Sequence, residues 1–176
     1  MDQPDDISVV AAEFRRHYDQ YYLGVIPRLL NEEGLILAFV SLLTAIECLA
    51  GAYRPKQGSG ERFQKFVKHF FPAPYHSITD QLWQFRNRMI HSFNPTPFVI
   101  SCHQSRMHLA SANGIAMLNV EDFYADVLIA SRGYFSALYS EPDLQTKFAE
   151  RMGDGDGGRI KPLTIVESVN APRPAI

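Results

Sequence analysis

Residues 35–52 read LILAFVSLLTAIECLAGA, and Glu47 is the only charged side chain in this run of 18 residues. A helix of this composition is apolar on nearly every face. That pattern is typical of the central helix of a bundle, or of a helix that also contacts a second subunit. The length would suit a membrane span as well. No second span accompanies the run, so we expect a helical bundle and no membrane partner.

Five further segments carry apolar residues at the three-to-four spacing of helices or end at helix-stop signals. They cover residues 5–31, 61–71, 78–93, 121–140 and 143–152. Pro27 is expected to kink or end the first helix, because proline lacks a backbone N–H and clashes with the preceding turn. The sequence therefore predicts a mainly α fold, an up-and-down bundle of four to five helices that forms one domain over residues 1–152.

Residues 97–120 differ from the rest of the chain. The segment from Phe98 to Cys102 has strand composition, and Asn113-Gly114 is a two-residue turn signal between two further candidate strands. We expect a small β-hairpin insertion here, or a three-strand meander. From Gly153 onward, the run Gly-Asp-Gly-Asp-Gly-Gly predicts a flexible C-terminal tail over residues 153–176.

The chain has 176 residues and a net charge of −2, but its charges are unevenly distributed. Residues 54–109 hold eight basic and two acidic side chains, whereas both flanks are net acidic. This basic block can attract an anionic partner such as nucleic acid, or it can be a set of solvated helix faces. Cys48 and Cys102 lack metal-ligand spacing, so we expect reduced thiols and neither a metal nor another cofactor. The acidic N-terminus is unlike a signal peptide, and a cytoplasmic location is expected.

The motif with the clearest chemical content lies in residues 82–92, LWQFRNRMIHS. Asn87 and His91 are four residues apart and share one helix face, while Arg86 is rotated from His91 by about 140°. Together they supply a bidentate phosphate ligand, an orienting amide and an imidazole that exchanges protons near pH 7. These groups suit metal-free cleavage of RNA, in which a 2′-hydroxyl attacks the adjacent phosphate. A full cycle needs two proton-transfer groups, and a two-fold dimer would supply the second.

The motif Arg86-Asn87-x-x-x-His91, on the last core helix of a four-helix arrangement, resembles the HEPN superfamily. The long kinked first helix, the near-apolar second helix with one Glu and the Phe-rich third helix are similar too. The resemblance covers residues 5–93, and it implies a dimeric helical bundle with the motif at the dimer cleft. It implies a metal-independent ribonuclease of a toxin–antitoxin, defence or RNA-processing system. On this reading Arg86 contacts phosphate, Asn87 is the polar residue that follows it and His91 is the acid/base.

Other readings of these residues stay open. Arg86 can pair with Glu47, because a buried carboxylate needs a partner, and such a pair would also orient the Arg. Arg88 is a solvated charge or a second phosphate ligand. The alternative function is a non-catalytic dimeric module that binds a nucleotide, RNA or a protein such as a cognate antitoxin. A purely structural dimerisation domain is a third possibility.

Overall fold

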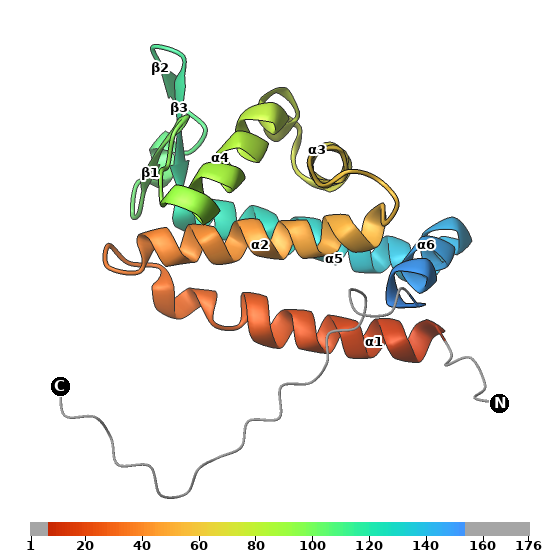
Figure 1. Cartoon of the computed structure of the whole chain (residues 1–176). Coiled ribbons are helices and arrows are strands. Elements are labelled where there is room, and N and C mark those ends of the chain that lie inside the picture. The colour runs from red at the N-terminus through yellow and green to blue at the C-terminus, as the bar shows by residue number, and fades with distance from the viewer. Residues whose placement is uncertain (1–6, 154–176) are drawn as a thin grey trace, which may run out of the picture.

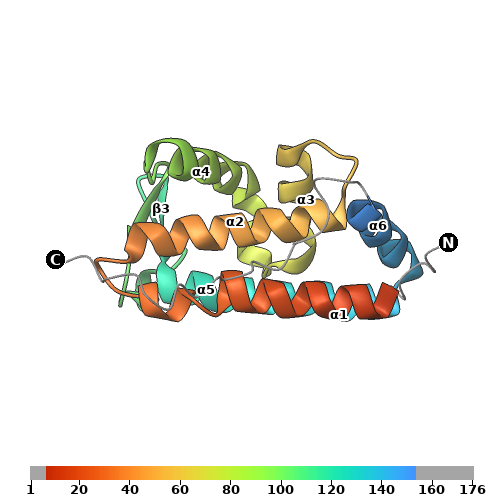
Figure 2. The same ribbon diagram turned by 60° about the horizontal axis from the view of Figure 1, so that its bottom comes forward.

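A computed structural model describes residues 7–153, which fold into six α-helices and a small sheet (Figure 1). The mainly α fold with a small β insertion is confirmed. The helices are α1 (Ile7–Tyr18), α2 (Leu35–Tyr53), α3 (Ser59–Phe70), α4 (Thr79–Ser92), α5 (Val120–Ser140) and α6 (Pro142–Gly153). In both views α2 runs through the middle of the molecule, with α1 along one side and α3 and α4 on the other (Figure 2).

The predicted central helix is present and extends one residue beyond the expected 35–52. Its buried side chains are not confined to one narrow stripe, since α2 contacts α3, α4, α5 and α6. They include Phe39, Leu42, Leu43, Ile46 and Leu49. By length and composition α2 is the one helix among residues 7–153 that could cross a membrane, and more than half of it is buried by the other helices.

The long first helix breaks earlier than Pro27. After α1 the chain forms a π-helix, η1 (Asp19–Leu23), and then a 3₁₀-helix, η2 (Ile26–Leu29). Pro27 therefore occupies the start of a new short helix, where its missing N–H costs nothing. A tight turn leads into α2, and the N–H of Gly34 donates to the side chain of Asn31 (2.7 Å).

The insertion holds three strands, β1 (Phe98–Ser101), β2 (Ser111–Ala112) and β3 (Ile115–Asn119), with a 3₁₀-helix η4 (Ser105–Met107) between the first two. The hairpin of β2 and β3 around Asn113-Gly114 is confirmed. The three-strand meander is wrong, because β1 pairs with β3 in parallel and the sheet order is β1-β3-β2. A parallel pair needs a crossover, and the segment that contains η4 provides it.

A polar cluster anchors the insertion to the bundle. The Tyr75 hydroxyl, on the 3₁₀-helix η3 (Ala73–Ile78), donates to Asp126 of α5 (2.7 Å) and lies 2.8 Å from Nε2 of His108. The backbone N–H of Asn119 donates to Nδ1 of His108 (3.1 Å). Because Nδ1 accepts this bond, the ring proton of a neutral His108 lies on Nε2, where it faces Tyr75 and Asp126.

The C-terminal end of the described chain differs slightly from the expectation. Gly153 belongs to α6 and not to the tail. The rest of the predicted tail, residues 154–176, lies outside the described residues, and so do residues 1–6.

Candidate functional site

The apolar side of α4 determines where its polar residues emerge. The buried residues recur at helical spacing and are Thr79, Leu82, Phe85 and Met89. The helix ends where Phe93 adopts a left-handed backbone (φ 49°) and its N–H donates to the Met89 carbonyl (3.1 Å). His91 therefore lies in the last turn, and its side chain is exposed.

Arg86 is held between two helices. One terminal nitrogen, Nη2, forms an ion pair with Glu47 of α2, and the other, Nη1, donates to the side-chain oxygen of Asn87 (3.0 Å). The guanidinium carbon also lies 5.3 Å from the centre of the Trp83 ring, within cation–π range. The expected pair between Arg86 and Glu47 is thus confirmed, and it links α4 to the central helix.

The environment of Arg86 is largely enclosed. The side chains of Arg86 and Glu47 are 16% and 17% exposed. Burial lowers the pKa of the Arg86 guanidinium from its usual high value, and its Nε atom is buried without a hydrogen-bond partner among residues 7–153. With one bond made by each terminal nitrogen, each keeps one N–H that can be offered to an anion.

His91 and Arg88 stand apart from this arrangement. His91 forms no hydrogen bond or ion pair with any residue of the described chain. Arg88 is exposed, and its Nη1 atom donates to the hydroxyl of Thr96 (2.6 Å), which in turn contacts Asn94 (2.9 Å). The structure therefore joins Glu47, Arg86 and Asn87, and leaves His91 free to face solvent or a second molecule.

Two arginines that the sequence did not single out complete the surroundings of Glu47. Arg62 of α3 lies 3.9 Å from the second carboxylate oxygen of Glu47. Arg151 of α6 contacts the same stretch of α2, close to Arg62. Nothing in the spacing of residues 47, 62 and 151 signals this proximity, because it arises only when α3 and α6, far apart in the sequence, both pack near the C-terminal end of α2.

Compared with models of known protein families, with characterised proteins and with solved structures, the chain has no match. The HEPN resemblance therefore rests on the motif and on the order of the helices.

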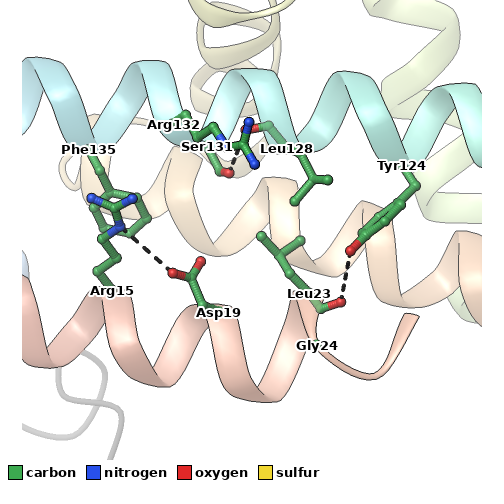
Figure 3. Close-up of a pocket in the computed structure, with 9 residues that line it drawn as sticks. All are labelled: Arg15, Asp19, Leu23, Gly24, Tyr124, Leu128, Ser131, Arg132 and Phe135. Carbon is green, nitrogen blue, oxygen red and sulfur yellow. Dashed lines mark hydrogen bonds and ion pairs between the residues drawn. The ribbon is translucent and has the colours of Figure 1, made fainter. Parts of the chain in front are cut away.

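A separate cavity of about 310 Å³ lies between the α1–η1 segment and α5 (Figure 3). Arg15 pairs with Asp19 (3.7 Å) and lies 5.4 Å from the centre of the Phe135 ring. At the other end Tyr124 reaches the carbonyl of Leu23 (3.4 Å). The π-helical turn of η1 forms one wall of this cavity. None of the residues predicted from the sequence lines it.

Among residues 7–153 no three His, Cys, Asp or Glu side chains are grouped so that they could hold a metal ion. Cys48 and Cys102 are both free thiols. The candidate site itself carries guanidinium, carboxylate, amide and imidazole groups.

Proposed function

We propose that the protein is a metal-independent RNA endonuclease that acts as a homodimer, in the manner that its resemblance to the HEPN superfamily implies. The single observation that carries the proposal is the arrangement on α4. A guanidinium is oriented by Glu47 and Asn87, and the exposed imidazole of His91 follows on the same helix. A pre-oriented cation and a proton-transfer group are two of the components that RNA transesterification requires.

A base removes the proton of the 2′-hydroxyl, the 2′-oxygen attacks the adjacent phosphorus, and the bond to the 5′-oxygen breaks. The leaving oxygen takes a proton from an acid, which gives a 2′,3′-cyclic phosphate and a 5′-hydroxyl end. In this step His91 is a proton-transfer group. Arg86 neutralises the phosphoryl oxygens through its remaining N–H groups, and Asn87 keeps the guanidinium in place.

Glu47 is a positioning residue in this scheme. Its carboxylate holds Arg86 from the side of α2, so it does not need to touch the RNA. Arg88, which is exposed and bonded to Thr96, is available as an outer phosphate contact.

A second copy of the chain supplies the second proton-transfer group. The proposal of a dimer is supported by exposed apolar side chains near this end of α4. Phe93, two residues after His91, is 62% exposed, and Leu37 in the first turn of α2 is 54% exposed. Two copies related by a two-fold axis would bury such residues and bring two imidazoles toward one cleft.

The test is cleavage of single-stranded RNA by purified protein in the presence of EDTA. The wild-type chain should produce fragments with cyclic phosphate ends, and His91→Ala should reduce the rate by at least about 100-fold. His69→Ala is the matched control, since His69 is an exposed histidine on α3. Cleavage that survives in His91→Ala would refute the assignment of this site.

The enclosure of Arg86 favours one alternative, a non-catalytic module that binds RNA, a nucleotide or a partner protein. A guanidinium that is 16% exposed and already paired can serve mainly to tie α4 to α2. In that case the wild-type chain would bind single-stranded RNA without forming products, and Arg86→Gln would act through stability alone.

A further inference from the structure

A second cationic site lies on the far side of Glu47 from the motif. Arg62 in the first turn of α3 and Arg151 in the last turn of α6 meet above Gly51 of α2. A Cβ atom built on Gly51 would lie 3.7 Å from the guanidinium carbon of Arg62 and 3.8 Å from Nε of Arg151. Two guanidiniums thus approach one point, and the missing side chain of Gly51 leaves room between them.

The positive charge there exceeds the negative charge. Glu47, one helical turn before Gly51, is the carboxylate at this place, and its Oε2 atom already accepts a hydrogen bond from Arg86. Its Oε1 atom lies 3.9 Å from Arg62, and Arg151 has no ion pair with a carboxylate of residues 7–153. Glu47 therefore pairs with two guanidiniums, and the third, that of Arg151, lies beside Arg62 without an ion pair of its own in the described chain.

The surroundings of Arg62 agree with an excess of positive charge at this place. The side chain of Arg62 is 19% exposed, and its Nε atom is buried without a partner within the described chain. Burial, and then the neighbouring charge of Arg151, lower the pKa of the Arg62 guanidinium. Like charges in a partly desolvated place repel each other strongly unless an anion lies between them.

We propose that Arg62 and Arg151 form a binding site for one phosphate group, located above Gly51. Guanidinium groups offer paired N–H donors that match the oxygens of a phosphate, and two of them can hold one tetrahedral anion from two sides. The site does not depend on the nuclease proposal, because neither arginine belongs to the motif of α4.

The experiment measures thermal unfolding of the full chain in sodium phosphate and in sodium chloride of equal ionic strength. Phosphate should raise the Tm of the wild-type protein by about 4 °C at saturating concentration. Arg151→Gln should lose this shift. In chloride it should be at least as stable as the wild type, because it removes a repulsion. Arg28→Gln, at an exposed arginine of η2, is the matched control and should keep the full shift.

A second measurement distinguishes free phosphate from a nucleic-acid backbone as the ligand. It repeats the unfolding experiment with an all-deoxy oligonucleotide, which lacks the 2′-hydroxyl needed for cleavage. If inorganic phosphate stabilises the wild type but not Arg151→Gln, the ligand is a free phosphate or a phosphomonoester. If only the oligonucleotide stabilises the protein, and Arg151 is again required, the ligand is a nucleic-acid backbone. Either result supports a phosphate site. An equal response in the wild type and Arg151→Gln, or no response to either anion, overturns it.

Discussion

Glu47 of α2 and Arg86 of α4 form an ion pair in which both side chains are more than four-fifths enclosed. The same carboxylate also faces Arg62 of α3. One acidic side chain in an otherwise uncharged helix therefore connects the central helix to two of the helices that pack on it. Its removal leaves cations that are partly buried and have no counter-charge.

Glu47→Gln should lower the free energy of unfolding by about 2–4 kcal/mol, because the amide keeps the shape of the side chain but not its charge. Denaturant unfolding measures the change. Glu61→Gln is the matched control, since Glu61 forms an exposed pair with Lys65 (2.7 Å), and its loss should cost less than about 0.5 kcal/mol. Equal costs for the two variants would contradict the role given to Glu47.

Gly34 makes a backbone contact that no other residue could keep. A Cβ atom at this position would lie 2.5 Å from the carbonyl oxygen of Leu29 and 2.7 Å from its Cα atom. Gly34→Ala should therefore shift the start of α2 and cost about 2 kcal/mol in unfolding free energy.

Gly133→Ala is the comparison for that variant. Its Cβ atom would meet only the ring of Phe70, at 3.4 Å, and α5 should gain up to about 1 kcal/mol from the better helix former. If Gly34→Ala were as stable as Gly133→Ala, the close approach of Gly34 to Leu29 would not exist in solution.

The tyrosine hydroxyl that bridges His108 and Asp126 should stabilise the link between the sheet and the bundle. Tyr75→Phe removes it and should cost about 1–2 kcal/mol, because two partly buried groups lose a partner. Tyr134→Phe removes an equally buried hydroxyl that has no partner among residues 7–153, so it should cost almost nothing. Similar unfolding free energies for the two variants would show that the bridge contributes nothing.

The thiol of Cys48 should react slowly with alkylating reagents. Burial raises its pKa to about 11, against a smaller opposing effect of a hydrogen bond from Tyr22 and the charge of Arg151. At pH 8 its thiolate fraction is then about 100-fold lower than that of an ordinary thiol. The native state also keeps the thiol proton to higher pH than the unfolded chain does. The contribution of Cys48 to stability is therefore complete below about pH 9 and decreases as the pH rises toward 11.

Alkylation by iodoacetamide measures this in Cys102→Ser, which leaves Cys48 as the one thiol of the sequence. The native protein should react far more slowly than the same protein in denaturant. Equal rates in the two conditions would mean that Cys48 is not enclosed.

The elements that the sequence predicts well are those whose signal is local. The apolar run from Leu35, the Phe-rich stripe of α3 and the stop after α4 all follow from side-chain spacing and from prolines in the chain. The Asn113-Gly114 turn is local too. The parallel pairing of β1 with β3 is not, because two strands of similar composition pair either way until their connection is folded.

The same division holds for the candidate site. Arg86, Asn87 and Glu47 could be named in advance, since a motif and a lone charge in an apolar helix both stand out. Arg62 and Arg151 could not, because they are ordinary surface-type residues until packing brings them to Gly51. The cavity beside η1 was also beyond prediction, as it depends on a π-helical turn that no residue type specifies.

The proposed nuclease activity is tested with a DNA oligonucleotide that contains a single ribonucleotide, incubated in EDTA with the wild-type chain and with His91→Ala. The wild type should cleave only on the 3′ side of the ribonucleotide and leave a 2′,3′-cyclic phosphate, while His91→Ala should leave the oligonucleotide intact. Cleavage at deoxynucleotides, or the same cleavage by both proteins, would contradict the proposal.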